Sequence, residues 1–136
     1  MKKNIIVLLF TAITVLSTST GCKKYPDGPD FSLRTRKARV ANTWKIENFK
    51  VGGVDLTSLV TGYTETFTTS GAYSYTWGVL NGSGTWTFQN DFAEIRLNGS
   101  DEQSNRVLTI LKLEEKSMWY TYMAAGVKNE IHLTEN

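Results

Sequence analysis

The sequence contains few of the residues from which catalytic and metal sites are usually built. Among 136 residues there are one cysteine and one histidine. One imidazole cannot provide a two-histidine metal site, and His132 falls on the polar face of its expected strand, away from any Ser-His-Asp triad. We therefore predict no catalytic residue, no metal ligand and no cofactor, and we expect that the protein is not an enzyme. An enzyme that uses tyrosine and glutamate without a cofactor is the alternative.

The chain also lacks an apolar run long enough to cross a membrane. A spanning helix needs about 20 apolar residues, whereas the run at residues 5–16 has twelve, two of which are threonines. Lys2 and Lys3 precede this run, and small residues follow it as far as Gly21. This order is typical of a secretory signal peptide, which we place at residues 1–21.

The single cysteine, Cys22, directly follows this segment. The stretch STSTGC resembles the lipobox of bacterial lipoproteins, with Ser19 where that family usually has leucine. The resemblance implies cleavage before Cys22, a diacylglycerol on its sulfur, and an anchor in the bacterial outer membrane, on its periplasmic or its cell-surface face. Ordinary signal cleavage that leaves a free thiol is the alternative.

The next residues combine proline with positive charge. Both prolines lie in YPDGPD, so we expect residues 22–31 to form a lipidated tether rather than part of the core. Residues 23–39 carry six basic and two acidic side chains, whereas the chain from residue 40 onward carries seven basic and eleven acidic ones. A basic stretch suits an anionic bilayer surface, with a solvated linker as the alternative. Because the folded part is acidic, nucleic acid is not an expected partner.

We expect one folded domain, at residues 32–136. It begins with a short helix within residues 32–40, with Ser32 as its N-cap. Threonine, tyrosine, valine, tryptophan and phenylalanine then dominate in short runs, as in strands. Brief connections, including a hairpin turn expected at residues 81–84, imply an antiparallel meander. The expected strands are residues 43–51, 63–69, 72–80, 84–89, 92–98, 105–114, 117–124 and 128–134.

Alternation in these runs gives the sheet one apolar face. Tyr73, Tyr75 and Trp77, for example, point to the side opposite their polar neighbours. Such strands form a sandwich or a closed barrel, and closure removes exposed edges. We therefore predict an all-β fold, an eight-stranded antiparallel up-and-down barrel with one short N-terminal helix. Eight strands leave an interior that is filled by side chains or just holds one small ligand.

Three segments carry a family resemblance. SLRTRKARVANTWKIENFKVGGVDLT, GTWTFQNDFAEIRL and RVLTILKLEEKSMWYTY resemble the small lipocalin-like lipoproteins of Bacteroidota. The resemblance implies a lipocalin- or calycin-like barrel in which Trp44 closes one end against Leu33 and Val40. Lipocalins have a Gly-x-Trp motif in the first strand, and here Asn42 replaces the glycine.

The inward aromatic side chains are the candidate ligand-binding residues, because large rings suit an apolar or amphipathic ligand. Core packing is the alternative for each ring. Paired catalytic carboxylates would require inward-facing acids such as Glu65 to meet inside the barrel. We predict a lipid-anchored envelope protein that binds a small apolar or amphipathic ligand; the alternative is an accessory subunit that binds an envelope protein and no small ligand. The candidate ligand-binding residues are Tyr73, Tyr75, Trp77, Trp86, Phe88, Tyr120 and Tyr122.

Overall fold

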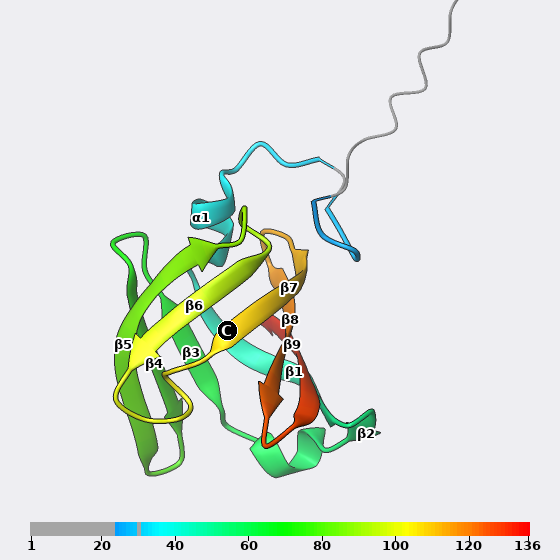
Figure 1. The fold of residues 1–136 in the computed structure, drawn as a ribbon, viewed down its shortest axis with the longest axis vertical. Coiled ribbons are helices and arrows are strands. Elements are labelled where there is room, and N and C mark those ends of the chain that lie inside the picture. Colours follow the sequence, from blue (N-terminus) through cyan, green and yellow to red (C-terminus); the bar gives the residue numbers. More distant parts are fainter. Residues whose placement is uncertain (1–23, 30) are drawn as a thin grey trace, which may run out of the picture.

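The computed structural model describes residues 24–29 and 31–136 and shows an all-β protein with one short α-helix (Figure 1). Cys22 and the expected signal peptide lie outside the described residues. The elements are α1 (Arg36–Val40), β1 (Thr43–Val51), β2 (Val54–Asp55), the 3-10 helix η1 (Thr57–Val60), β3 (Thr64–Phe67), β4 (Ala72–Trp77), β5 (Leu80–Gln89), β6 (Glu94–Gly99), β7 (Val107–Leu113), β8 (Ser117–Ala124) and β9 (Val127–Glu135).

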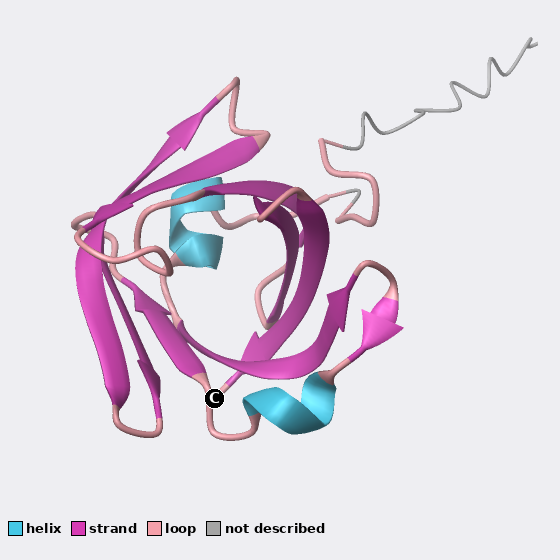
Figure 2. Ribbon diagram, turned by 60° about the horizontal axis from the view of Figure 1, so that its bottom comes forward, coloured by secondary structure: helices cyan, strands magenta, loops and turns pink. Residues whose placement is uncertain are grey.

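Eight of these strands form a closed antiparallel barrel, which confirms the predicted fold. From β3 to β9 each strand pairs with the next, and β1 pairs with both β3 and β9. The β1–β9 seam runs from Trp44 opposite Glu135 to Val51 opposite Asn129. Figure 2 shows the resulting ring of strands. The short β2 pairs only with the end of β1 and lies outside the ring.

Alternate side chains fill the barrel. In β6, for instance, Ile95 and Leu97 are buried and their neighbours are partly or fully exposed. Burying such side chains contributes about 1.5–3 kcal/mol each, so this cluster is the main source of stability. The buried cluster consists of Tyr25, Val40, Trp44, Phe67, Tyr73, Trp86, Ile95, Leu97, Leu108, Ile110, Leu113, Met118, Tyr120, Ile131 and Leu133.

The turn between β4 and β5 differs from the prediction. It lies at Gly78 and Val79, because Trp77 pairs with Leu80, whereas residues 81–84 belong to β5. Gly78 adopts a positive φ of 59°, which glycine tolerates in tight turns. The glycines of the NGSG stretch therefore do not serve a turn, and the role of Gly82 is described with the site below.

Helix α1 and Trp44 close one end of the barrel. The side chain of Thr35, not Ser32, caps the helix by accepting a hydrogen bond from the Ala38 amide at 3.1 Å. Trp44 is fully buried, and its indole Nε1 donates to the Val40 carbonyl at 3.0 Å. The prediction that Leu33 packs against Trp44 is wrong. Because the helix begins only at Arg36, Leu33 lies in the preceding loop and is 92% exposed.

Residues 24–29 are docked on the barrel, so the prediction that this part of the chain is a tether outside the core is wrong. Tyr25 is buried in the main cluster and its hydroxyl donates to the Phe92 carbonyl at 3.1 Å. The Asp27 amide donates to the Leu111 carbonyl at 2.8 Å, and the Leu113 amide donates to the Gly28 carbonyl at 3.2 Å. The segment thus continues the hydrogen-bonding of β7, and the aromatic ring of Tyr25 outweighs the disruptive effect of the prolines.

Candidate functional site

A buried carboxyl group, that of Glu65, is the centre of a polar cluster inside the barrel. The alternation of β3 points Glu65 inward, where it is 1% exposed. Its Oε2 accepts hydrogen bonds from the hydroxyls of Tyr63 at 3.0 Å and Tyr73 at 2.9 Å, and its Oε1 accepts one from Tyr120 at 2.8 Å. We call these four residues the Glu65 cluster. The carboxyl of Glu65 thus accepts hydrogen bonds from three phenol groups, one just before β3, one in β4 and one in β8.

Burial dominates the electrostatics of the Glu65 cluster. It raises the pKa of Glu65, because an apolar interior disfavours the charged form, and the three hydroxyl hydrogen bonds oppose this effect. Burial beside the same carboxyl raises the pKa of Tyr63, Tyr73 and Tyr120 far above the ordinary value. The phenols are therefore protonated donors and not bases. Glu65 is the one buried acid of the described part, so the paired carboxylates of a glycosidase are not assembled there.

A loop between β6 and β7 folds over the Glu65 cluster. We call residues 100–106 the mouth loop, because they lie at the end of the barrel opposite α1. The side-chain amide of Gln103 donates through Nε2 to the Tyr63 hydroxyl at 2.6 Å, and the Asp101 carboxylate accepts from the Tyr75 hydroxyl at 3.2 Å. Ser104 is buried and donates to the Asp101 carboxylate at 2.7 Å. The mouth loop therefore joins the β6–β7 side of the barrel to the β3–β4 side.

Two glycines make room for the mouth loop. A Cβ atom at Gly82 would collide with the Asp101 carboxylate and the Tyr75 ring, and a Cβ atom at Gly99 would collide with Ser104. Contacts this close are not tolerated without movement of the neighbour. Gly82, which the sequence suggested for a turn, and Gly99 therefore allow close approach of a loop to the barrel wall.

Beside the mouth loop, β7 and β8 separate. Their pairing ends at Thr109 opposite Thr121, whereas β8 continues along β9 as far as Ala124. A hollow of about 430 Å³ opens at this separation, and we call it the mouth cleft. Its lining residues are Asn105, Arg106, Val107, Thr109, Thr121, Tyr122, Met123 and Lys128.

Arg106 gives the mouth cleft its chemical character. Its guanidinium carbon lies 4.1 Å from the centroid of the Tyr122 ring, and its Nε and Nη2 donate to the Glu102 carbonyl at 3.2 and 3.1 Å. Its Nη1 is buried without a hydrogen-bond partner among the residues that the structure describes. Such an unpaired donor is unfavourable until an acceptor reaches it. With Lys128 as a second cation and Val107 on the wall, the cleft suits an amphipathic molecule that carries an acceptor oxygen.

The predicted ligand-binding aromatics are divided among three environments. Tyr73, Trp86 and Tyr120 are each 2% exposed and belong to the core, where other side chains surround them. Trp77, at the end of β4, is 38% exposed. Their ligand-binding role stays a prediction, and Tyr122 is the member that lines the mouth cleft. The partly buried members are Tyr75, Phe88 and Tyr122.

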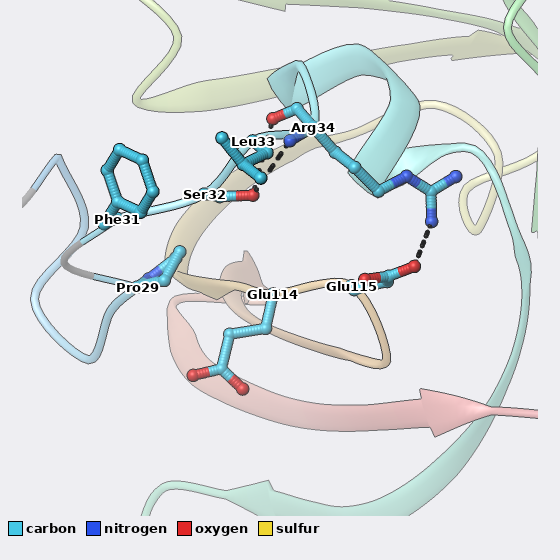
Figure 3. A pocket seen from close by; sticks show the side chains of 7 residues that line it. All are labelled: Pro29, Phe31, Ser32, Leu33, Arg34, Glu114 and Glu115. Carbon is cyan, nitrogen blue, oxygen red and sulfur yellow. Dashed lines mark hydrogen bonds and ion pairs between the residues drawn. The ribbon is translucent and has the colours of Figure 1, made fainter.

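A second hollow, of about 460 Å³, lies at the α1 end of the barrel (Figure 3). The loop before α1 and the β7–β8 turn form its walls, and Arg34 Nη1 contacts Glu115 Oε1 at 2.7 Å across it. It lacks a buried polar group that could orient a ligand. The residues around it are Pro29, Phe31, Ser32, Leu33, Arg34, Glu114 and Glu115.

In the parts covered by the structure, residues 24–29 and 31–136, no group of three or more His, Cys, Asp or Glu side chains could hold a metal ion. His132 lies on the outer side of β9, where its ring stacks on Trp119 with centroids 3.9 Å apart and its Nε2 is 2.7 Å from Glu130 Oε1. None of the helices seen in these parts is long and apolar enough to cross a bilayer.

Comparison with known proteins adds little about function. No protein-family model matches the chain, and a search of curated proteins finds no significant match. Among solved structures, the crystal structure of a DUF4847 family protein from Bacteroides vulgatus is similar, with 12% sequence identity and a TM-score of 0.47. The similarity covers 71% of this chain and 94% of that chain. At this identity and score it carries no argument about what the protein binds.

Sequence reasoning did not predict the mouth loop residues Asp101, Gln103 and Arg106 as parts of a site. Their position depends on a loop that folds back over the barrel, and a loop has no periodic pattern. In the structure Gly82 lies inside β5 and Gly99 ends β6, and glycines in strands often mark the close approach of another segment. The sequence, however, placed Gly82 in an expected turn and Gly99 just after an expected strand.

Proposed function

We propose that the protein is a lipid-anchored component of a bacterial outer membrane whose barrel binds a small amphipathic molecule at its mouth. The mouth cleft carries this proposal, because it is a hollow of about 430 Å³ lined by Arg106, a partly buried cation whose Nη1 has no hydrogen-bond partner among the described residues. Pockets for small ligands combine apolar walls with placed polar groups. The mouth cleft has three apolar or aromatic side chains, two cations, an asparagine and two threonines, so it is more polar than most such pockets.

The polar end of the ligand would lie at Arg106 and Lys128. An acceptor oxygen on the ligand would satisfy the unpaired Nη1 of Arg106, and hydrogen bonds to a charged group contribute about 1.5–3 kcal/mol. The apolar part would lie along Val107, Tyr122 and Met123. The mouth loop would control deeper access, because Gln103–Tyr63 and Asp101–Tyr75 are the side-chain hydrogen bonds that join it to β3 and β4. In this proposal the protein holds its ligand and performs no chemical step.

Three probes with one tail and different head groups test the proposal. Octanoate, 1-octanol and octylammonium are added to the full chain, and the midpoint of thermal unfolding is followed. We expect octanoate to raise the midpoint most, because its carboxylate matches the free donor of Arg106. Thr109→Trp should remove the effect by filling the cleft, whereas Thr87→Trp, at an exposed threonine of β5, should retain it. The absence of any shift with all three probes would refute the site.

The anchor is tested separately. Mass spectrometry of the N-terminal peptide, taken from protein purified from its own membrane, should show a diacylglycerol on Cys22. The same preparation should release a bound amphiphile on organic extraction. A free thiol at Cys22 would refute the anchor but leave the mouth cleft as a ligand site.

A second candidate function is the binding of an envelope protein through the rim of the mouth. The β4–β5 and β8–β9 hairpin tips and η1 lie at this end of the barrel (Figure 1). These segments and β2 carry exposed apolar side chains, and exposed apolar patches often mark protein interfaces. A pull-down with the anchor intact should then recover a stoichiometric protein partner, which the ligand proposal does not require. The exposed side chains are Val54, Leu59, Trp77, Val79, Leu80, Met123 and Val127.

A further inference from the structure

Two bulky apolar side chains at the α1 end of the barrel lie in solvent. Phe31 is 80% exposed and Leu33 is 92% exposed, and both belong to the loop before α1. Figure 3 shows them on the loop that borders the hollow at this end. They are not needed for the core, which α1 and Trp44 close without them. A phenylalanine and a leucine held in water so close together indicate a surface that is covered in the working state of the protein.

The short stretch of chain between Cys22 and the docked residues 24–29 keeps the proposed lipid anchor close to this surface. Residues 24–29 are fixed to the barrel, with Lys24 Nζ 2.9 Å from Asp91 Oδ2 and the Asp27 amide bonded to the Leu111 carbonyl. Only two peptide units separate Cys22 from Lys24, and they span at most about 7 Å. A lipid on Cys22 would therefore be joined to the barrel by a very short linker, which holds the barrel directly against the bilayer surface.

On the side of α1, the surroundings of Phe31 fit the head groups of an anionic bilayer. On the other side, the hollow of Figure 3 carries two carboxylates, both of which are in ion pairs. One hollow is lined by Phe31, Lys24 and Arg36 among others, and therefore lies between the loop, residues 24–29 and α1. A neighbouring hollow is lined by Arg36 and Lys37 among others. Within the described residues, neither Arg36 nor Lys37 forms an ion pair. Arg36 lies 5.0 Å from the centroid of the Phe92 ring, and Lys37 lies 6.0 Å from that of Trp86. Neither contact neutralises the charge, so both cations can attract phosphate groups close to the surface.

We infer that the face formed by Phe31, Leu33, Arg36 and Lys37 rests in the interfacial layer of an anionic bilayer, with the two apolar side chains inserted among the lipids. This inference rests on the lipid anchor of the proposed function. It fixes an orientation: the α1 end faces the membrane, and the mouth cleft, at the opposite end of the barrel, faces away from it. Side chains inserted in this way reach about 5–10 Å into the boundary between head groups and acyl chains.

Quenching of tryptophan fluorescence by brominated phospholipids tests this orientation. The full lipidated chain is placed in vesicles of phosphatidylcholine and phosphatidylglycerol, and the wild-type signal is subtracted. Phe31→Trp should be quenched by bromines near the head groups at least about twofold more than Val79→Trp, because interfacial insertion reaches only that layer. Val79 is 94% exposed at the mouth end and is therefore a matched control. Both positions are in solvent, so neither change threatens folding.

Further arms separate the outcomes. Quenching at position 31 should fall when phosphatidylglycerol is omitted or when Arg36→Glu and Lys37→Glu are combined; unchanged quenching would overturn the part assigned to the two cations. Equal quenching at positions 31 and 79, with the diacylglycerol on Cys22 present, would overturn the orientation and leave the proposed function intact. A chain without the diacylglycerol would overturn both the anchor and this inference.

Discussion

The substitution Glu65→Gln tests the electrostatics of the Glu65 cluster most directly. The variant keeps the shape of the side chain but has one acceptor oxygen in place of two. If that oxygen takes the place of Oε2, it retains the hydrogen bonds from Tyr63 and Tyr73, and the hydroxyl of Tyr120 loses its acceptor. An unsatisfied buried hydroxyl costs about 1–3 kcal/mol. We expect the altered hydrogen bonding to lower the free energy of unfolding by about this amount at every pH. A pH-dependent term adds to this loss.

The sign of that term follows from the raised pKa of Glu65 in the folded protein. Between the pKa of the unfolded chain and that of the folded protein, the folded state binds more protons. The free energy of unfolding therefore falls as the pH rises through this interval, by up to about 1.4 kcal/mol per pH unit for one group. Glutamine does not titrate, so the stability of wild type minus that of Glu65→Gln should decrease as the pH rises from about 4.

Urea unfolding followed by tryptophan fluorescence, at a series of pH values from 4 to 8, measures this difference. Glu47→Gln, at an exposed position of β1, removes a glutamate without touching the cluster and corrects for the change in overall charge. A difference between wild type and Glu65→Gln that grows with pH would refute the reasoning. It would mean that the three phenols outweigh burial and hold Glu65 as an anion.

Three further substitutions test other parts of the structure. Gly82→Ala should displace the mouth loop, because its Cβ collides with Asp101, at a cost of about 1–3 kcal/mol and with faster amide hydrogen exchange in residues 100–106. Trp44→Ala should lower the free energy of unfolding by about 3–5 kcal/mol in a denaturant titration, because Trp44 is fully buried beside Val40. Tyr25→Ala should release residues 24–29 from β7 and make them the first site of limited proteolysis, while leaving the barrel folded.

Period-two alternation was enough to predict the barrel, because each strand buries one face. The boundaries of β1 and β8 were predicted as they occur, and those of β3 to β7 and β9 differ by a few residues, most at the start of β5. The error at β5 has a clear cause. Glycine is allowed in turns and is also needed where two segments approach closely, and the sequence does not separate these two uses. The contact between Gly82 and Asp101 exists only in the folded chain.

The N-terminal segment and the site were harder to predict for a related reason. Two prolines between Tyr25 and Phe31 indicated a tether, but the burial of one aromatic ring fixed the segment to β7. Glu65 was recognised as an inward-facing acid, whereas two of its phenol partners, Tyr73 and Tyr120, were interpreted as ligand-binding or core rings. Hydrogen bonds between residues 55 positions apart, such as Tyr120 to Glu65, depend on the closure of the barrel and leave no local pattern.

The β1–β9 seam has a consequence for how the newly made chain folds. It joins Trp44 to Glu135, whereas the other strand pairs of the ring join segments that are close in the sequence. Contacts of such long separation form late, because a large loop must first be closed. A nascent chain therefore keeps two unpaired strand edges until its final strand is available. If the chain is exported, as proposed, it can be threaded through an export channel in that state. It needs protection from aggregation until β9 arrives.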